Sequence, residues 1–355
     1  MAQRASGSPA VAHALDSLSC LSPAENILNS LLKLADVRVR FRTLSTARAI
    51  LNGVSDPFVD AVNGVSLEIR EGETYGLIGE SGSGKTTLAR SIIGLLKPQE
   101  GSIQYDGDEL IGRSALEMKK IRRTIGAMFQ DPVGSLSPRM SIYSLLAEPF
   151  KIHNQKDCDF ESEVRRLLEM VGLSYDFASR YPHQLSGGQA RRIGVARALA
   201  LNPRLIIADE PTAGLDVSVQ GEILNLLNKL QHQIGLSILI ITHNLNIVRH
   251  ITDRMGIMYL GRIIEQGPTK AIFDSPVHPY TLALLSANPE PDPDATIDRI
   301  ELQGEVPSLL NRPQGCEFHP RCPFVGNNCD AKFPFSKNVT KDHSYCCHYP
   351  RNLGC

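Results

Sequence analysis

One glycine-rich stretch, Gly79–Arg90, limits the possible folds of this chain more than any other feature. It reads GESGSGKTTLAR, follows the apolar run ETYGLI and precedes a segment with helical apolar spacing. A loop of this kind connects a strand to a helix, and its backbone N–H groups converge on phosphate at the helix N-terminus. We therefore predict an α/β fold that binds a nucleotide through this loop.

The residue types in the loop define separate roles. A lysine at the end of such a loop reaches the outer phosphate oxygens, and the hydroxyl that follows it ligates Mg²⁺. We assign these two roles to Lys85 and Thr86. The remaining predicted phosphate contacts in the loop are Gly79, Ser81, Gly82, Ser83, Gly84 and Thr87.

Composition narrows the class of protein. The chain has 355 residues, enough for about two domains, and a formal net charge of −1, so no global basic field argues for nucleic acid. Apolar runs such as LSILIIT are shorter than the roughly 20 residues that span a bilayer. The first residues lack the apolar core of a signal sequence. We expect a cytoplasmic chain with a loose N-terminal tail over residues 1–35.

A second motif, RLIIADEPTAGLD at residues 204–216, selects the chemistry. Its apolar run predicts a strand that ends at Asp209, and a carboxylate beside the phosphate loop can hold Mg²⁺ through water. The next residue, Glu210, can reach a water aligned with the γ-phosphate and act as its general base. This pair of carboxylates favours ATP hydrolysis over a GTPase or a small-molecule kinase.

A third motif lies between these two, in YPHQLSGGQARRIGVARALA. Ser186, Gly187, Gly188 and Gln189 precede or open a helix, which makes a second set of donors suited to phosphate. One chain does not usually wrap both glycine loops around one nucleotide. The sequence therefore implies a second subunit.

In order and spacing, GESGSGKTT, LSGGQ, LIIADE and ITHN resemble the ATP-binding subunits of ABC transporters, over roughly residues 35–270. The resemblance implies a P-loop NTPase domain whose phosphate loop and LSGGQ motif, from two subunits, sandwich ATP. The partner is identical or a paralogue. Dimer closure then drives two transmembrane permease subunits and, indirectly, an extracytoplasmic solute-binding protein.

The resemblance also assigns single residues. Gln130, in MFQDP, matches the glutamine that senses Mg²⁺ and the attacking water, and His243, in IITHN, matches the histidine that contacts the γ-phosphate. Asp216 matches an aspartate that communicates across the dimer. An aromatic side chain is expected to stack on adenine; Phe58 is preferred, with Phe41 as the alternative.

The predicted domains follow from these motifs. Residues 36–270 form the ATPase domain, with a mixed sheet, an antiparallel β-subdomain near residues 36–75 and a helical subdomain at about 131–184. The subdomain begins directly after Gln130, where the family places a coupling helix of the permease. Residues 271–355 form a C-terminal cysteine-rich extension.

Within this extension, HPYT and GCEFHPRC are similar to the C-terminal region of oligopeptide and dipeptide importers. The resemblance implies a peripheral subunit at the cytoplasmic face of the membrane that hydrolyses ATP to power peptide import. Importers of nickel, sugars or glutathione in the same subgroup remain alternatives. Two further alternatives are a soluble ABC ATPase in DNA repair or translation and an iron–sulfur assembly ATPase.

Six of the eight cysteines lie after residue 315, which indicates a local site and not a disulfide framework. The spacing of Cys316, Cys322 and Cys329, with a later cysteine, suits an all-sulfur cluster or tetrahedral Zn²⁺. The resemblance implies a four-iron four-sulfur cluster with Cys347 as fourth ligand, although Cys346 is an alternative.

Overall fold

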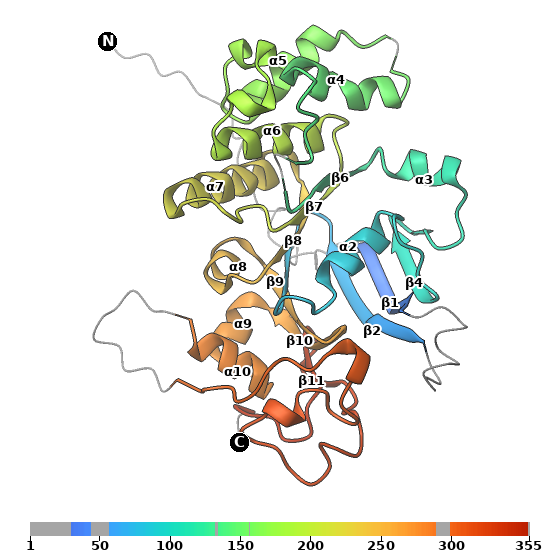
Figure 1. The fold of residues 1–355 in the computed structure, drawn as a ribbon, viewed down its shortest axis with the longest axis vertical. Helices are drawn as coiled ribbons and strands as arrows, with labels where there is room; N and C mark the ends of the chain where they lie inside the picture. The colour runs from blue at the N-terminus through green and yellow to red at the C-terminus, as the bar shows by residue number, and fades with distance from the viewer. Residues whose placement is uncertain (1–29, 44–56, 132–133, 156, 289–298, 354–355) are drawn as a thin grey trace, which may run out of the picture.

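The computed structural model describes residues 30–43, 57–131, 134–155, 157–288 and 299–353 (Figure 1). Most of the predicted N-terminal tail, together with Cys20 and Cys355, lies outside these residues. Within the described part of the chain, no helix is both long enough and apolar enough to cross a membrane.

The central element is a mixed sheet of eight strands in the order β11-β12-β10-β9-β3-β8-β7-β6 (Figure 1). The strands from β9 to β6 run parallel, and those from β9 to β11 run antiparallel. Strands β7 and β8 are buried along their whole length, as expected for parallel strands with both faces covered. The strand bounds are β3 Thr74–Ile78, β6 Ile125–Met128, β7 Leu205–Asp209, β8 Ser237–Thr242, β9 Arg254–Tyr259, β10 Arg262–Pro268, β11 Lys337–Thr340 and β12 His343–Tyr345.

A second, antiparallel sheet has four strands in the order β2-β1-β4-β5. Its bounds are β1 Ser30–Arg42, β2 Phe58–Arg70, β4 Glu100–Tyr105 and β5 Asp108–Glu109. It therefore extends beyond the range predicted from sequence at both ends: residues 30–35, expected in the loose tail, begin β1, and β4 and β5 lie after the phosphate loop. Helix α2, Lys85–Ile92, packs between the two sheets, with Leu88 and Ile92 fully buried in the shared core.

Most of the remaining helices cover the other face of the central sheet and one of its ends, whereas α3 lies on the side of α2 and buries Met118 in the core that contains Leu88 and Ile92. Helices α4, α5 and α6 gather beyond β6, at the top of Figure 1, and share one apolar core with α7. Polar caps at Ser141, Asp159 and Ser186 mark where α4, α5 and α6 begin. The helix bounds are α3 Ala115–Ile121, α4 Ile142–Ile152, α5 Phe160–Met170, α6 Gly187–Leu199, α7 Val217–Ile234, α8 Leu245–Ile251, α9 Thr269–Asp274 and α10 Pro279–Ser286.

The C-terminal segment, residues 299–353, shares its core with the ATPase part of the chain. Strand β12 pairs with β10, so the segment extends the central sheet. The fully buried Glu265 of β10 accepts the backbone N–H groups of Val277 and His278 at 2.9 and 2.8 Å, and its carboxylate lies 2.9 Å from His343 Nε2. Phe318 packs edge-on against Tyr259 of β9. The segment is thus built onto the sheet that carries the phosphate loop.

Candidate nucleotide site

The phosphate loop lies between β3 and α2, and close backbone approach requires two of its glycines. A Cβ on Gly79 would lie 2.2 Å from the carbonyl oxygen of Met258, and one on Gly84 would lie 2.2 Å from that of Ala61. Gly84 also has a φ of 100°, which side-chain-bearing residues rarely adopt. The loop can take this path only with glycine at both positions.

Lys85, the first residue of α2, is directed back into the loop. Its Nζ donates to the carbonyl oxygens of Gly79 and Glu80 at 2.7 and 2.9 Å and to Ser83 Oγ at 3.1 Å. Burial lowers the pKa of Lys85, while the carboxylates of Glu210 and Asp209 oppose this shift. The ammonium is therefore positioned where a phosphate would meet it.

A cavity of about 670 Å³ opens beside this loop. It is lined by Ala61, Glu80, Ser81, Gly82, Gly84, Lys85, Thr86, Thr87, Gln130, Asp209, Glu210, Ala213, His243 and Leu309. The structure thus brings Gln130, Asp209, Glu210 and His243 to the phosphate loop, from the carboxyl ends of the three parallel strands β6, β7 and β8. Carboxyl ends of parallel strands meet at one edge of a sheet, and ligands commonly bind there.

Three oxygen-bearing side chains in the cavity fit Mg²⁺. Asp209 accepts a hydrogen bond from Thr86, and its Oδ1 is buried without a hydrogen-bond partner among the described atoms. Burial raises the pKa of Asp209, and the bond from Thr86 counteracts this. With the amide oxygen of Gln130, these groups form a donor set of hard oxygens, which is the type that Mg²⁺ prefers.

Glu210 and His243 line the same cavity and are in contact with each other. His243 Nδ1 lies 2.6 Å from Glu210 Oε1, and the hydroxyl of Thr242 donates to Glu210 Oε2 at 3.3 Å. The Glu210 side chain is 11 % exposed, whereas that of His243 is 70 % exposed. Glu210 also has a φ of 50°, an uncommon left-handed conformation for a non-glycine residue. A buried carboxylate at the cavity wall can accept a proton from water, and the exposed imidazole can contact a ligand.

Sequence reasoning missed Arg191, which holds the backbone of Glu210. Arg191 lies in α6, is 3 % exposed, and donates to the carbonyl oxygens of Glu210 at 3.1 Å and Ala213 at 2.6 Å. Burial lowers its pKa, against the opposing effect of Asp131 and Glu210. The only sequence signal is an arginine two positions after the LSGGQ motif. Arg191 thus connects α6, the helix that begins in the LSGGQ motif, to the turn that contains Glu210.

Other predicted site residues do not line this cavity. Ser186 caps α6 by accepting the N–H of Gln189 at 3.3 Å, and Asp216 caps α7 by accepting the N–H of Val219 at 3.0 Å, which lowers the pKa of Asp216. Gly187 and Gly188 open α6, and a Cβ on Gly188 would meet Val219 at 2.7 Å. These residues lie at the N-termini of α6 and α7, outside the lining of the cavity beside the chain's own phosphate loop.

Both candidate adenine platforms are exposed aromatic residues of the second sheet. Phe58 begins β2 and is 43 % exposed, and Phe41, near the end of β1, is 39 % exposed. The guanidinium of Arg40 lies over the Phe58 ring at 5.3 Å. Neither ring lines the described cavity, so the choice between them stays a prediction.

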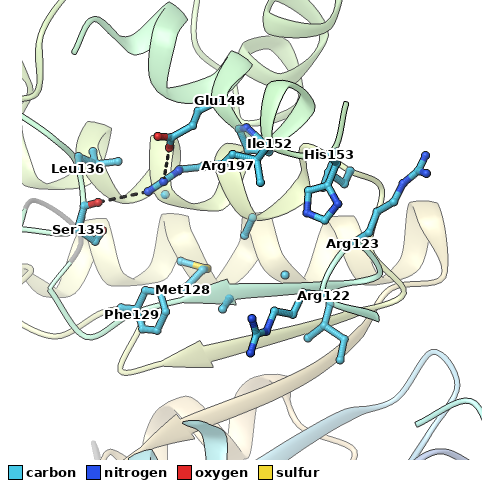
Figure 2. A pocket seen from close by; sticks show the side chains of 17 residues that line it. Arg122, Arg123, Met128, Phe129, Ser135, Leu136, Glu148, Ile152, His153 and Arg197 are labelled. Atoms are coloured by element: carbon cyan, nitrogen blue, oxygen red, sulfur yellow. Dashed lines mark hydrogen bonds and ion pairs between the residues drawn. The ribbon is translucent and has the colours of Figure 1, made fainter. Parts of the chain in front are cut away.

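A separate cavity of about 240 Å³ lies between the edge strand β6 and the helical layer (Figure 2). Arg197 of α6 crosses it, pairing with Glu148 of α4 at 2.6 Å and donating to the carbonyl oxygen of Ser135 at 3.2 Å. Arg122 and Arg123 lie on its opposite side in Figure 2. The cavity therefore adjoins the segment that follows Gln130 and has a basic border.

Comparison with known proteins decides the family. The model of the ABC transporter family matches residues 62–213, and that of the oligopeptide/dipeptide transporter C-terminal region matches residues 264–329. The oligopeptide transport ATP-binding protein AppF of Bacillus subtilis is 47 % identical over 82 % of this chain and 89 % of its own length. The chain belongs to the ABC transporter family. It is one of the family's ATPase subunits.

Two further comparisons agree with this assignment. The oligopeptide transport ATP-binding protein OppF of Salmonella typhimurium is 45 % identical over 86 % of this chain and 92 % of its own length. A dimeric post-hydrolysis structure of the ATP-binding cassette MJ0796, bound to ADP and Pi, aligns with a TM-score of 0.58 at 31 % identity. It covers 67 % of this chain and 98 % of that one. The fold is that of an ABC nucleotide-binding domain.

The predicted iron–sulfur cluster is wrong. Within the described residues, no group of three or more His, Cys, Asp or Glu side chains is placed to hold a metal ion, and the relatives are named only as transport ATP-binding proteins. Cys316, Cys322, Cys329 and Cys347 do line one cavity, but its free volume is about 10 Å³. Burial raises the pKa of Cys316 to about 11 and of Cys347 to about 12. None of these four cysteines forms a disulfide bond.

Proposed function

We propose that this chain hydrolyses ATP to power the import of peptides through separate transmembrane subunits, as a peripheral subunit at the cytoplasmic face of the membrane. The observation that carries the proposal is the single cavity in which Lys85, Gln130, Asp209, Glu210 and His243 meet. The match of residues 264–329 to an oligopeptide/dipeptide transporter region, and relatives named for oligopeptide transport, support peptide as the cargo.

In this proposal each side chain has a role set by its position. The loop amides and Lys85 bind the phosphates, and Thr86, Asp209 and Gln130 would hold Mg²⁺, which would supply charge neutralisation at the phosphates. Glu210 takes a proton from the attacking water. His243, held through its contact with Glu210, orients the γ-phosphate. Arg191 stabilises the backbone at Glu210 by donating to its carbonyl oxygen.

The proposal includes a second ATPase subunit. Ser186 and the N-terminus of α6, with Gly187, Gly188 and Gln189, present backbone donors that the chain's own cavity does not use. A neighbouring chain would offer its phosphate loop to them, and Asp216 would lie at the same interface. The likeness to a cassette solved as a dimer supports this arrangement.

We place the contact with the permease at the cavity between β6 and the helical layer (Figure 2). Movement of Gln130 at the nucleotide site would be passed to Ser135, five residues further along the chain. Ser135 is tied to α6 through Arg197, and the same guanidinium is tied to α4 through Glu148. A short helix of the permease docked here would therefore respond to changes at the γ-phosphate.

The proposal is tested by reconstituting the chain with permease subunits and a solute-binding protein from the same organism. ATP hydrolysis in proteoliposomes should rise when a di- or oligopeptide is supplied outside, and labelled peptide should accumulate inside. The Lys85→Ala variant should abolish both signals because the phosphates lose their cationic partner. Stimulation by nickel, a sugar or glutathione and not by peptides would refute the cargo, and hydrolysis that ignores the permease would refute the transport role.

A further inference from the structure

The C-terminal segment reaches the nucleotide cavity from outside the ATPase motifs. Leu309, from the 3₁₀ turn η3 at Leu309–Asn311, lines the cavity together with Ala61 of β2. This turn contacts β2, and Arg312 next to it donates to the carbonyl oxygen of Asp60 at 2.6 Å. Arg312 also pairs with the buried Glu317, so the turn is fixed against the strand that borders the phosphate loop.

A second contact connects the same segment to the phosphate loop itself. Arg321, at the end of the 3₁₀ turn η4 (His319–Arg321), pairs with the Glu80 carboxylate through two nitrogens: Nη1 lies 3.0 Å from Oε2, and Nη2 lies 3.3 Å from Oε1. The Arg321 side chain is 9 % exposed and that of Glu80 is 26 % exposed. A two-point arginine–carboxylate pair with little access to water fixes both position and charge.

Glu80 lies at a point in the loop where its charge affects a bound triphosphate. It lines the cavity beside Ser81 and Gly82, and its carbonyl oxygen accepts from Lys85 Nζ. A carboxylate here repels the negatively charged phosphates unless a cation balances it. Arg321 is the cation that pairs directly with this carboxylate, although it lies 241 residues further along the chain.

We infer that the C-terminal segment is part of the nucleotide site: Arg321 is a positioning residue that neutralises Glu80 and thereby allows the phosphate loop to accept a nucleoside triphosphate. The inference rests on the proposed ATPase function and assigns a further role within it. It gives the segment after residue 299 a direct effect on ATP affinity. Loosening of this segment would weaken ATP binding without any change in the ATPase motifs.

The charge argument makes the two partners behave differently when each is changed alone. Arg321→Gln leaves Glu80 uncompensated, so the Kd for ATP should rise about tenfold, and the Kd for the less charged ADP should rise less. Glu80→Gln leaves the Arg321 charge free to attract phosphate, so ATP should bind more tightly, by about threefold. The double variant should return to within about threefold of the parent.

The test is calorimetric titration of the full chain with ATP in the absence of Mg²⁺, and separately with ADP. The matched control is Arg351→Ala, which removes an arginine of the same segment whose guanidinium lies over the Phe324 ring. It should leave both Kd values unchanged. Thermal unfolding of every variant identifies those that do not fold, and Glu80→Gln keeps the inference testable if Arg321→Gln does not.

Two outcomes would overturn the inference. One is an ATP Kd for Arg321→Gln within twofold of the parent. The other is a rise in Kd, equal for ATP and ADP, in both Arg321→Gln and Glu80→Gln, because loss of a purely structural ion pair would have that effect. ATP binding by Lys85→Ala shows whether only the inference about Arg321 fails or the proposed function fails as well. If Lys85→Ala loses ATP binding while Arg321→Gln does not, only the inference fails; if Lys85→Ala binds ATP normally, the function fails as well.

Discussion

Replacing Glu210 with glutamine removes its ability to accept a proton with little change in shape. Glu210 Oε2 accepts from Thr242, and Oε1 lies 2.6 Å from His243 Nδ1. The glutamine amide oxygen can still accept from Thr242, and glutamine tolerates the φ of 50° no worse than glutamate does. The fold and the phosphate loop should therefore remain intact.

The expected loss follows from the chemistry that Glu210 would perform. A positioned general base contributes about 10²- to 10⁴-fold to a rate, which corresponds to about 3 to 5 kcal/mol of barrier. We expect the kcat of ATP hydrolysis to fall within that range. The Kd for ATP should change by less than about threefold, because Lys85 and the loop amides are unaltered.

Phosphate release under saturating Mg²⁺-ATP measures kcat, and calorimetric titration measures the Kd of ATP. Glu222→Gln is the matched control, since Glu222 is an exposed carboxylate of α7 that pairs with Arg192 at 2.7 Å. It should retain parental kcat. If Glu210→Gln turns over ATP within threefold of the parent, the role given to this carboxylate is refuted.

Three other predictions concern the dimer, the C-terminal core and pH. Ser186→Arg should abolish ATP hydrolysis by the variant alone. Mixing it with Lys85→Ala chains should restore part of the activity, because the phosphate loop of one chain and the LSGGQ motif of the other then form one intact site. No recovery of activity would contradict the shared site. Phe318→Ala should lower the free energy of unfolding by about 3 to 5 kcal/mol in a urea titration, since this ring is 1 % exposed. Burial lowers the pKa of His278 from 6.5 to about 4. Between these two pH values the unfolded chain binds a proton at His278 that the folded chain does not bind, so the free energy of unfolding falls as the pH drops from 6.5 towards 4. His278→Asn, which keeps an acceptor for the Tyr280 N–H, should reduce the stability lost between pH 7 and 5 by about 2 kcal/mol; an unchanged pH slope of thermal unfolding would refute this.

The parts of the site that were predictable are local in sequence. The phosphate loop places its glycines, Lys85 and Thr86 within a few residues, and Asp209 and Glu210 are adjacent at a strand end. Gln130 and His243 needed the family resemblance, because a lone glutamine or histidine after an apolar strand does not indicate a role. The order of the parallel strands then brings all of them to one edge of the sheet.

The prediction of an iron–sulfur cluster failed because it relied on the spacing of cysteines along the chain. Spacing along the chain showed that Cys316, Cys322, Cys329 and Cys347 could come together, and they do line one cavity. The volume left between the thiols depends on the side chains packed around them, such as Phe318 and His278, and that volume is about 10 Å³. Sequence spacing contains no information on this packing.

The sequence by itself determined the family, the nucleotide chemistry and the elements that carry the motifs, because these depend on short-range patterns of glycine, apolar and charged residues. Only the tertiary structure decided that Arg191 holds the backbone of Glu210, that Leu309 lines the nucleotide cavity and that Arg321 pairs with Glu80 of the phosphate loop. These contacts form because β12 adds to β10 and the C-terminal segment folds back over β2. Pairings between strands and segments so distant in the chain depend on the packing of the whole core, which no local pattern specifies.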